Sequence, residues 1–256
     1  MGTQPRRRES RGHRRDPHGP YWIYGAHAVR AALGNDARTV RRLLATREAA
    51  AAALPPDAAP ERAEATAIAA LLPPGAVHQG LAALVDPLSP PPLADVLAAS
   101  PGPVLVLDQV TDPRNVGAIL RSAAAFGAAA VIVQDRHAPI EGGAMARAAA
   151  GALERVPLLR AVNLARTLDA LKQAGLWIVG LDADAPTGLA EAGLGDRRLA
   201  LVLGSEDEGM RRLTREACDL TVRLPQTGAV ESLNVSVAAA VALYAVQHDR
   251  LERKRA

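Results

Sequence analysis

The chain has 256 residues, of which 49% are hydrophobic and 22% charged, a composition typical of a soluble globular protein with one large domain or two smaller ones. No apolar run reaches the roughly 18 to 20 residues that a membrane-spanning helix needs, and the N-terminus lacks the apolar segment of a secretory signal. The single cysteine, Cys218, excludes an internal disulfide framework. We therefore expect a cytoplasmic protein without a membrane partner.

The net charge of +3 is distributed unevenly along the chain. Residues 1–20 contain six arginines and two acidic residues, which leaves 24 basic and 25 acidic residues in the rest. This composition predicts a disordered basic arm. Arginine-rich arms attract phosphates without reading sequence, so the arm permits nucleic acid as a partner. A terminus that only improves solubility would look the same.

The first part of the chain predicts short elements that end at a proline-rich segment. Residues 87–103 contain six prolines, and proline is poorly tolerated inside helices and sheets. We therefore predict a linker and domain boundary at 87–103. The elements expected before it are a strand from residue 21, a helix ending near Gly34, a strand at 40–46, helices within 48–72 that prolines interrupt, and a strand at 77–86.

From residue 104 onward, apolar strands alternate with amphipathic helices. The pattern predicts strands at 104–110, 129–134, 156–162, 176–183, 199–206 and 219–225, and helices at 115–126, 143–153, 163–174, 210–217 and from about 233. Such alternation is typical of an α/β fold with a mainly parallel sheet. In these sheets ligands bind beyond the carboxyl ends of the strands, which directs attention to 108–121, 203–209 and 224–234.

Common nucleotide and metal signatures are missing from the sequence. The only lysines, Lys172 and Lys254, do not follow a glycine, which excludes a Walker-type phosphate loop. No G-x-G-x-x-G follows a predicted strand, so a nicotinamide oxidoreductase is disfavoured. The six histidines are scattered without H-E-x-x-H, and we expect no metal site.

Each polar candidate at a strand end also has a structural explanation. Asn115 and Ser232 are suitable helix caps, and the acidic residues around Glu206 are favourable near a helix start. The last predicted helix carries Leu233, Val237, Val241 and Tyr244 on one apolar stripe, which fits either a dimer contact or burial against its own sheet. Only the combination of three such segments predicts a pocket.

Three motifs carry a resemblance to a known family. They are D-x-V-x-D-P-x-N-x-G-A-I-x-R-S-A-x-x-F-G at 108–127, L-G-S-E-x-E-G at 203–209 and L-P-x-x-G-x-x-E-S-L-N-V-S-x-A at 224–238. In order and separation they resemble the motifs of the SpoU branch of the SPOUT RNA methyltransferases. The first part, with YGAHAVRAAL and HQGLAAL, is similar to the L30e-like RNA-binding domain of some of these enzymes. Asp207 departs from the pattern, because many relatives carry a small residue such as glycine there.

The resemblance implies a fold and a reaction. The implied fold is a small L30e-like α/β domain at 21–86, followed by a SPOUT domain at 104–256 with a deep trefoil knot built from about residues 200–235. The implied reaction is 2′-O-methylation of a ribose in RNA with S-adenosylmethionine as cofactor, carried out by a homodimer. A guanosine of 23S rRNA is the favoured target, and a tRNA 2′-O-methyltransferase and a non-catalytic RNA-binding protein are the alternatives.

The resemblance also implies roles for particular residues. Backbone groups of Gly204, Leu224 and Leu233 would hold the adenine of the cofactor. Arg121 would engage the phosphate and hydroxyl of the target nucleotide, and Asn115 would position Arg121 or the ribose. Glu206 would shape the second loop, whereas Ser232 and Asn234 would fix the third.

Overall fold

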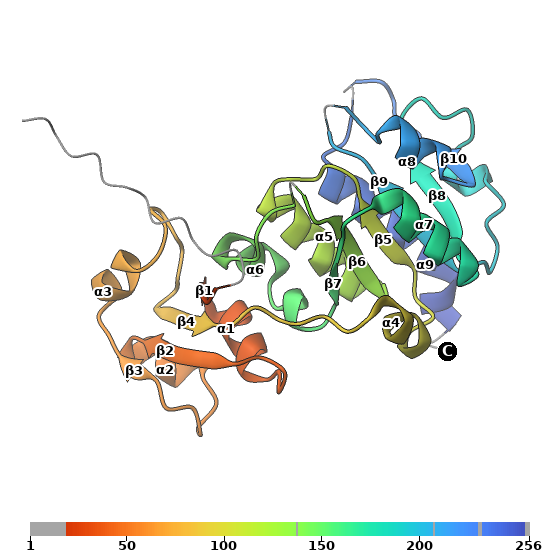
Figure 1. Ribbon diagram of the computed structural model, residues 1–256. Coiled ribbons are helices and arrows are strands. Elements are labelled where there is room, and N and C mark those ends of the chain that lie inside the picture. Colours follow the sequence, from red (N-terminus) through yellow and green to blue (C-terminus); the bar gives the residue numbers. More distant parts are fainter. Residues whose placement is uncertain (1–18, 137, 207, 230–231, 254–256) are drawn as a thin grey trace, which may run out of the picture.

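The computed structural model describes residues 19–136, 138–206, 208–229 and 232–253, arranged around two β-sheets (Figure 1). The expected basic arm, 1–20, lies almost entirely outside the described residues. The first sheet has the strand order β1-β4-β2-β3, and the second has the order β10-β8-β9-β5-β6-β7. The strands of the first sheet all precede those of the second in the chain, so the two sheets form from separate segments.

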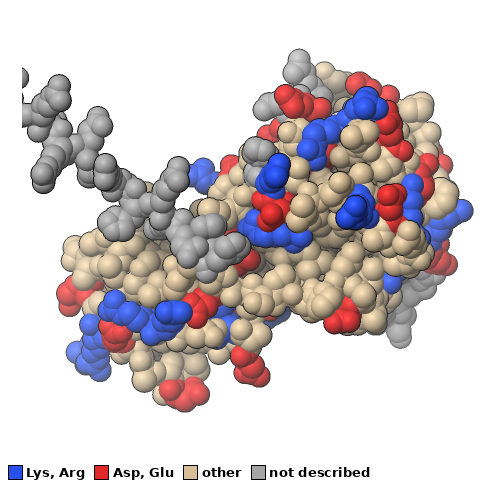
Figure 2. Space-filling model, in the orientation of Figure 1, with Lys and Arg blue, Asp and Glu red and all other residues tan. Residues whose placement is uncertain are grey.

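The four-stranded sheet is formed by β1 (Tyr21–Tyr24), β2 (Val40–Ala45), β3 (Glu61–Arg62) and β4 (Leu81–Val85), with α1 (Ala26–Leu33), α2 (Arg47–Ala53) and α3 (Ala65–Ala70). β4 is antiparallel to β1 and β2, and β3 is parallel to β2. The short β3 is not apparent in the sequence pattern. Figure 2 shows basic side chains over this sheet with acidic ones beside them, and Arg42 pairs with Glu61 there.

The six-stranded sheet is parallel throughout, as the strand and helix alternation predicts. Its strands are β5 (Val104–Leu107), β6 (Ala130–Gln134), β7 (Leu158–Ala161), β8 (Trp177–Leu181), β9 (Leu199–Leu203) and β10 (Leu220–Val222). The connecting helices are α5 (Pro113–Ala125), α6 (Gly143–Ala149), α7 (Leu164–Gln173), α8 (Arg212–Glu216) and α9 (Val235–Arg253). The mainly parallel α/β fold is therefore confirmed.

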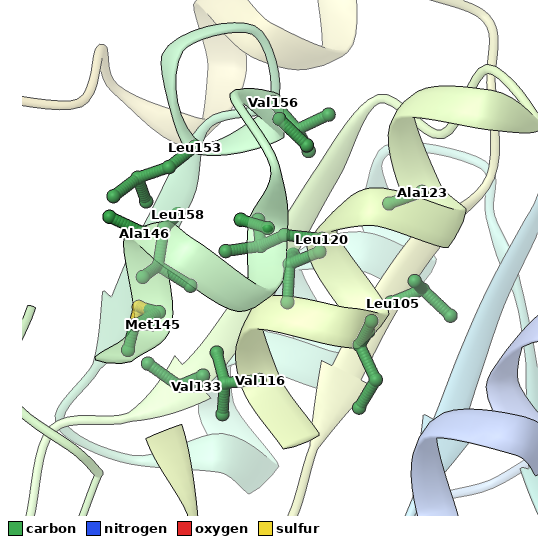
Figure 3. Close-up of a cluster of buried hydrophobic side chains, with 14 of the residues drawn as sticks. Leu105, Val116, Leu120, Ala123, Val133, Met145, Ala146, Leu153, Val156 and Leu158 are labelled. Atoms are coloured by element: carbon green, nitrogen blue, oxygen red, sulfur yellow. The ribbon is translucent and has the colours of Figure 1, made fainter. Parts of the chain in front are cut away.

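Both faces of the six-stranded sheet are covered, which explains its continuous apolar strands. Alternate residues of β5 point to opposite sides. Leu105 belongs to a core with α5, α6 and α9, whereas Val104 and Val106 pack with Val96 and the leucines of α7. Figure 3 shows the first core, in which Val116 and Leu120 of α5 lie among Met145, Leu153 and Leu158. This packing fixes α5 against one face of the six-stranded sheet.

Two segments differ from the predicted elements. The helix expected at 143–153 is divided into α6 and a short 3-10 helix, η1 (Ala152–Glu154), because Ala150 and Gly151 adopt positive φ angles of 50° and 92°. The turn runs close to α1, since a Cβ on Gly151 would lie 2.7 Å from that of Ala31. The range 87–103 contains a helix, α4 (Leu93–Ala99), which begins directly after the proline run.

The apolar stripe of α9 is largely exposed. The helix starts at Val235, so Leu233 precedes it, and Val237, Val241 and Tyr244 have exposed fractions of 47%, 44% and 52%. The buried face instead uses Val235, Ala239, Ala242 and Leu243. Burial against its own sheet is therefore the wrong explanation for this stripe.

In the described part of the chain, no helix is long and apolar enough to cross a membrane.

A buried polar network joins the two sheet units. Arg38, which follows α1, has no exposed side-chain surface and forms an ion pair of 2.7 Å with Glu154 of η1. Asn35 donates to the same carboxylate at 2.8 Å, and the Tyr21 hydroxyl donates to Glu141 at 3.1 Å. Burial raises the pKa of Glu141. The network holds the four-stranded unit against the α6–η1 region.

Candidate cofactor and catalytic site

A pocket of about 290 Å³ lies beyond the carboxyl ends of β8 and β9, where ligands bind in parallel α/β sheets. Its walls come from the end of β8, the loop after β9, Arg215 of α8, and the segment from Leu224 to the start of α9. Three residues expected at a cofactor site, Gly204, Leu224 and Leu233, line it. The fold therefore brings two of the three motifs together around one cavity.

The loop after β9 is a tight turn that requires glycine. Ser205 and Gly209 exchange backbone hydrogen bonds of 3.0 and 3.1 Å, which folds the loop back on itself. A Cβ on Gly204 would lie only 2.0 Å from the carbonyl carbon of Gly209, and Gly209 itself has a φ of 66°. Two backbone segments thus approach each other beside the pocket more closely than any side chain would permit.

A buried carboxylate fixes the far end of this loop. Asp108, directly after β5, is fully buried and accepts a 3.0 Å hydrogen bond from the backbone N–H of Arg211. The Arg211 guanidinium pairs with the same carboxylate at 2.7 Å. Because Arg211 precedes α8, Asp108 holds the start of that helix next to the pocket. The sequence pattern assigns no role to Asp108. Its position directly after a buried strand, at the start of the first motif, could have marked it as a candidate site residue.

Asn115, Glu206 and Asn234 form one hydrogen-bonded cluster at the edge of the pocket. The Glu206 carboxylate accepts from Asn115 Nδ2 and from Asn234 Nδ2, both at 2.8 Å, and Asn234 Nδ2 also lies 3.1 Å from Asn115 Oδ1. The backbone N–H of Val235 donates to Glu206 at 3.3 Å. This cluster joins all three motifs, and it places the amide of Asn115 beside the loop after β9.

The helix caps differ from those expected. Asp112 caps α5 by accepting from the backbone N–H of Arg114 at 2.7 Å, and Asn115 lies within the first turn. Asn234 Oδ1 accepts from the backbone N–H of Ser236 at 2.9 Å and so takes the capping position at α9. Capping therefore explains neither Asn115 nor Ser232.

Acidic side chains dominate the charge of the pocket. Asp182, Asp184, Glu206 and Glu208 line it, together with one guanidinium, that of Arg215. Arg215 pairs with Asp182 at 3.0 Å, which leaves a negative excess among the described lining residues. A cavity of this kind favours a ligand with positive charge and an apolar or aromatic part, the latter facing leucines 203, 224 and 233.

A family model described as the SpoU rRNA Methylase family matches residues 102–244, more than half of the chain. The chain belongs to the SpoU rRNA Methylase family.

Curated relatives of this SpoU methylase carry a common name. The 23S rRNA (guanosine-2′-O-)-methyltransferase RlmB of Vibrio vulnificus is 48% identical over 182 residues, which are 69% of this chain and 73% of that protein. The RlmB of Nitrosomonas europaea is 52% identical over 170 residues, 65% of each chain. The crystal structure of the SpoU methyltransferase AviRb from Streptomyces viridochromogenes, in complex with AdoMet, has a TM-score of 0.75, with 91% of each chain covered at 24% identity, and thus shares the fold.

Three SpoU motif residues have still to be placed in the structure: Ser232, Asp207 and Arg121. Ser232 is exposed and lines the pocket, and Asp207 lies outside the described residues. Arg121 does not line this pocket within one chain. It lies farther along α5 and borders a separate cavity together with His27, Arg30 and Arg155. Among the described residues of one chain, no hydrogen bond joins Arg121 to Asn115, because an offset of six positions places their side chains on different sides of α5.

Proposed function

We propose that this SpoU methylase transfers a methyl group from S-adenosylmethionine to the 2′-hydroxyl of a ribose in RNA, with a guanosine of 23S rRNA as the favoured target. The observation that carries the proposal is the Asn115–Glu206–Asn234 cluster at the edge of the acidic pocket. The curated name of the 48% identical relative supports the choice of 23S rRNA. An rRNA substrate places the reaction in the cytoplasm.

The pocket suits S-adenosylmethionine in charge and shape. Its carboxylates complement the sulfonium and amino groups of the cofactor. Backbone groups of Gly204, Leu224 and Leu233 would hold the adenine, and the leucine side chains would contact its faces. When bound, the cofactor supplies an activated methyl group, so that the protein has to position the acceptor hydroxyl and assist the loss of its proton.

Different motif residues shape the pocket and position the substrate. Glu206, held by Asn115 and Asn234, keeps the three motif segments together at the pocket. Ser232 and Asn234 hold the third loop and contact the substrate. Arg121 binds the phosphate and hydroxyl of the target nucleotide. Because a guanidinium stays protonated in ordinary surroundings, Arg121 acts through charge and orientation.

In a homodimer, Arg121 of one subunit would reach the cofactor pocket of the other subunit. The exposed stripe of Val237, Val241 and Tyr244 on α9 forms the contact in this proposal, and α9 packs against α5, which carries Arg121. An exposed apolar stripe is a typical oligomer contact. Tyr244 also contacts Phe126 at the end of α5, with ring centroids 6.0 Å apart, so a partner on the stripe lies next to α5.

The division of the chain and its knot are part of the same proposal. An L30e-like domain at 21–86 is supported by strands β1 to β4, which all lie in that range, and a SPOUT domain at 104–256 by the start of the family match at residue 102. The trefoil knot involves residues 200–235. It is supported by Arg223, whose backbone pairs with residues 187 and 189 of the connection between β8 and β9.

A methylation assay with labelled cofactor tests the reaction and its substrate. We expect the full-length protein to methylate 23S rRNA and not tRNA, and mass spectrometry to place the methyl group on a guanosine ribose. Arg121→Ala should slow transfer about a hundredfold or more, as does the loss of an electrostatic catalytic group, while the affinity for S-adenosylmethionine stays the same. Methylation of tRNA alone would refute the proposed substrate, and a wild-type rate for Arg121→Ala would refute its role.

Mixed dimers test whether Arg121 acts across the dimer. One chain carries Arg121→Ala and the other carries Gly204→Val, which blocks the pocket loop. If Arg121 serves the partner's pocket, the mixed dimer contains one complete site and regains activity that neither variant has alone. Absence of recovery in a dimer that has formed would show that each chain uses its own Arg121.

A further inference from the structure

A second cavity, of about 340 Å³, lies where α1 of the four-stranded unit meets α5 and the turn between α6 and η1. It is separate from the acidic pocket and shares no lining residue with it. Five alanines on its walls keep it open, and Gly151 forms part of its wall close to α1. The cavity thus exists only because the two sheet units pack together.

The charge of this cavity is entirely positive. The guanidinium-bearing side chains of Arg30, Arg121 and Arg155 line it from three different elements, together with the imidazole of His27, and the lining contains no carboxylate. None of the three guanidiniums forms a hydrogen bond or an ion pair with another described residue. Several other arginines in the described part of the chain are paired, as Arg41 is with Asp86 and Arg42 with Glu61.

The acidic residue nearest in sequence is unable to neutralise the cluster. Glu154 precedes Arg155, but its buried carboxylate is bound by Arg38 and Asn35. Three like charges facing one concavity repel each other unless an anion lies between them. Guanidiniums bind phosphate in bidentate geometry, so a phosphodiester is the anion that three arginines around one cavity fit best.

We propose that this cavity binds a backbone phosphate of the RNA substrate next to the methylated nucleotide, with Arg30 and Arg155 as its ligands beside Arg121. The inference rests on the proposed function. Arg30 belongs to the four-stranded unit, whereas Arg121 belongs to α5. The RNA chain therefore passes from the cofactor pocket that Arg121 serves onto the four-stranded unit. The junction of the two units then contributes directly to substrate binding.

The test compares Arg30→Gln and Arg155→Gln with Arg166→Gln, a control that removes the same charge from exposed α7 on the opposite face of the six-stranded sheet. Binding of full-length protein to 23S rRNA is measured over a range of salt concentrations. Each cavity variant should weaken binding about tenfold and lower the slope of log Kd against log salt by about one, as expected for one lost phosphate contact. Arg30→Lys should recover part of the loss. Affinity for S-adenosylmethionine and the thermal midpoint should match the wild type.

The outcomes separate this subsite from the function on which it rests. If the wild type methylates 23S rRNA while both cavity variants bind it with wild-type affinity and salt slope, the subsite is wrong and the function stands. An equal loss in Arg166→Gln would also overturn the subsite, since it would show a general effect of charge. If the wild type neither binds nor methylates RNA, both proposals fail.

Discussion

At the scale of single residues, the cluster at the pocket depends on the orientation of one amide. Asn234 Oδ1 accepts from the backbone N–H of Ser236, so its Nδ2 must face Asn115 and Glu206. A carboxylate at 206 accepts from both asparagine side chains at once, which a neutral donor at that position would not do. The chemistry of the three side chains therefore specifies how the start of α5, the loop after β9 and the start of α9 meet.

Cys218 provides a prediction about pH. Burial raises the pKa of its thiol to about 11, and the thiol donates to the Thr214 carbonyl at 3.3 Å. At pH 8 the folded protein should therefore react with iodoacetamide about a hundredfold more slowly than the unfolded chain, because only the thiolate reacts. The unfolded thiol ionises first, so the free energy of unfolding should fall as pH rises from about 9 towards 11. Rapid labelling of the folded protein at pH 8 would contradict this placement.

At the scale of elements, the ends of helices and strands form the site. Asp108 at the end of β5 fixes the start of α8, and Asn234 both caps α9 and joins the cluster. Gly204 at the end of β9 permits the loop to close on Gly209. The regular elements hold these ends in place, and the chemistry lies in the few residues between them.

Gly204→Ala tests the loop after β9. The added methyl group would lie 2.0 Å from the Gly209 carbonyl carbon and 2.2 Å from the Met210 nitrogen, so the backbone has to move. We expect a loss of about 1–3 kcal/mol in the free energy of unfolding, the usual cost of overpacking, and cofactor affinity at least tenfold weaker by calorimetry.

Gly34→Ala is the matched control for this variant. Gly34 has a φ of −89°, and its nearest neighbour would be 3.6 Å from the new Cβ. Its unfolding free energy should change by no more than about 0.5 kcal/mol. Equal behaviour of the two variants would show that close approach at Gly204 is unimportant.

At the scale of the whole molecule, the two sheet units are joined by the buried pair of Arg38 and Glu154. The side chains have exposed fractions of 0% and 5%, so each charge depends on the other for its solvation. The proposed phosphate cavity lies at the same junction, between α1 and the α6–η1 turn. A change in this packing should therefore affect stability and RNA binding together.

Arg38→Met tests the junction. It leaves the Glu154 carboxylate buried without its partner, and we expect the free energy of unfolding in urea to fall by about 3–5 kcal/mol. Arg42→Met is the control, because Arg42 and Glu61 form an exposed pair, and it should cost less than about 1 kcal/mol. If both variants lost the same small amount, the junction would not depend on this pair.

The sequence by itself determined the α/β class, the parallel sheet and the positions of the motif loops. These depend on the spacing of apolar residues and on short motifs, both of which are local properties. It also predicted the stripe on α9 but not what covers it, because periodicity identifies an apolar face without naming its partner.

Only the tertiary structure decided where the motif residues lie relative to one another. It joined Asn115 to Glu206 and Asn234, which are separated by 91 and 119 positions in the chain. It also placed Arg121 in a different cavity, beside Arg30. The direction of a helical side chain relative to other elements depends on how the helix packs, and that packing is set by contacts between distant segments.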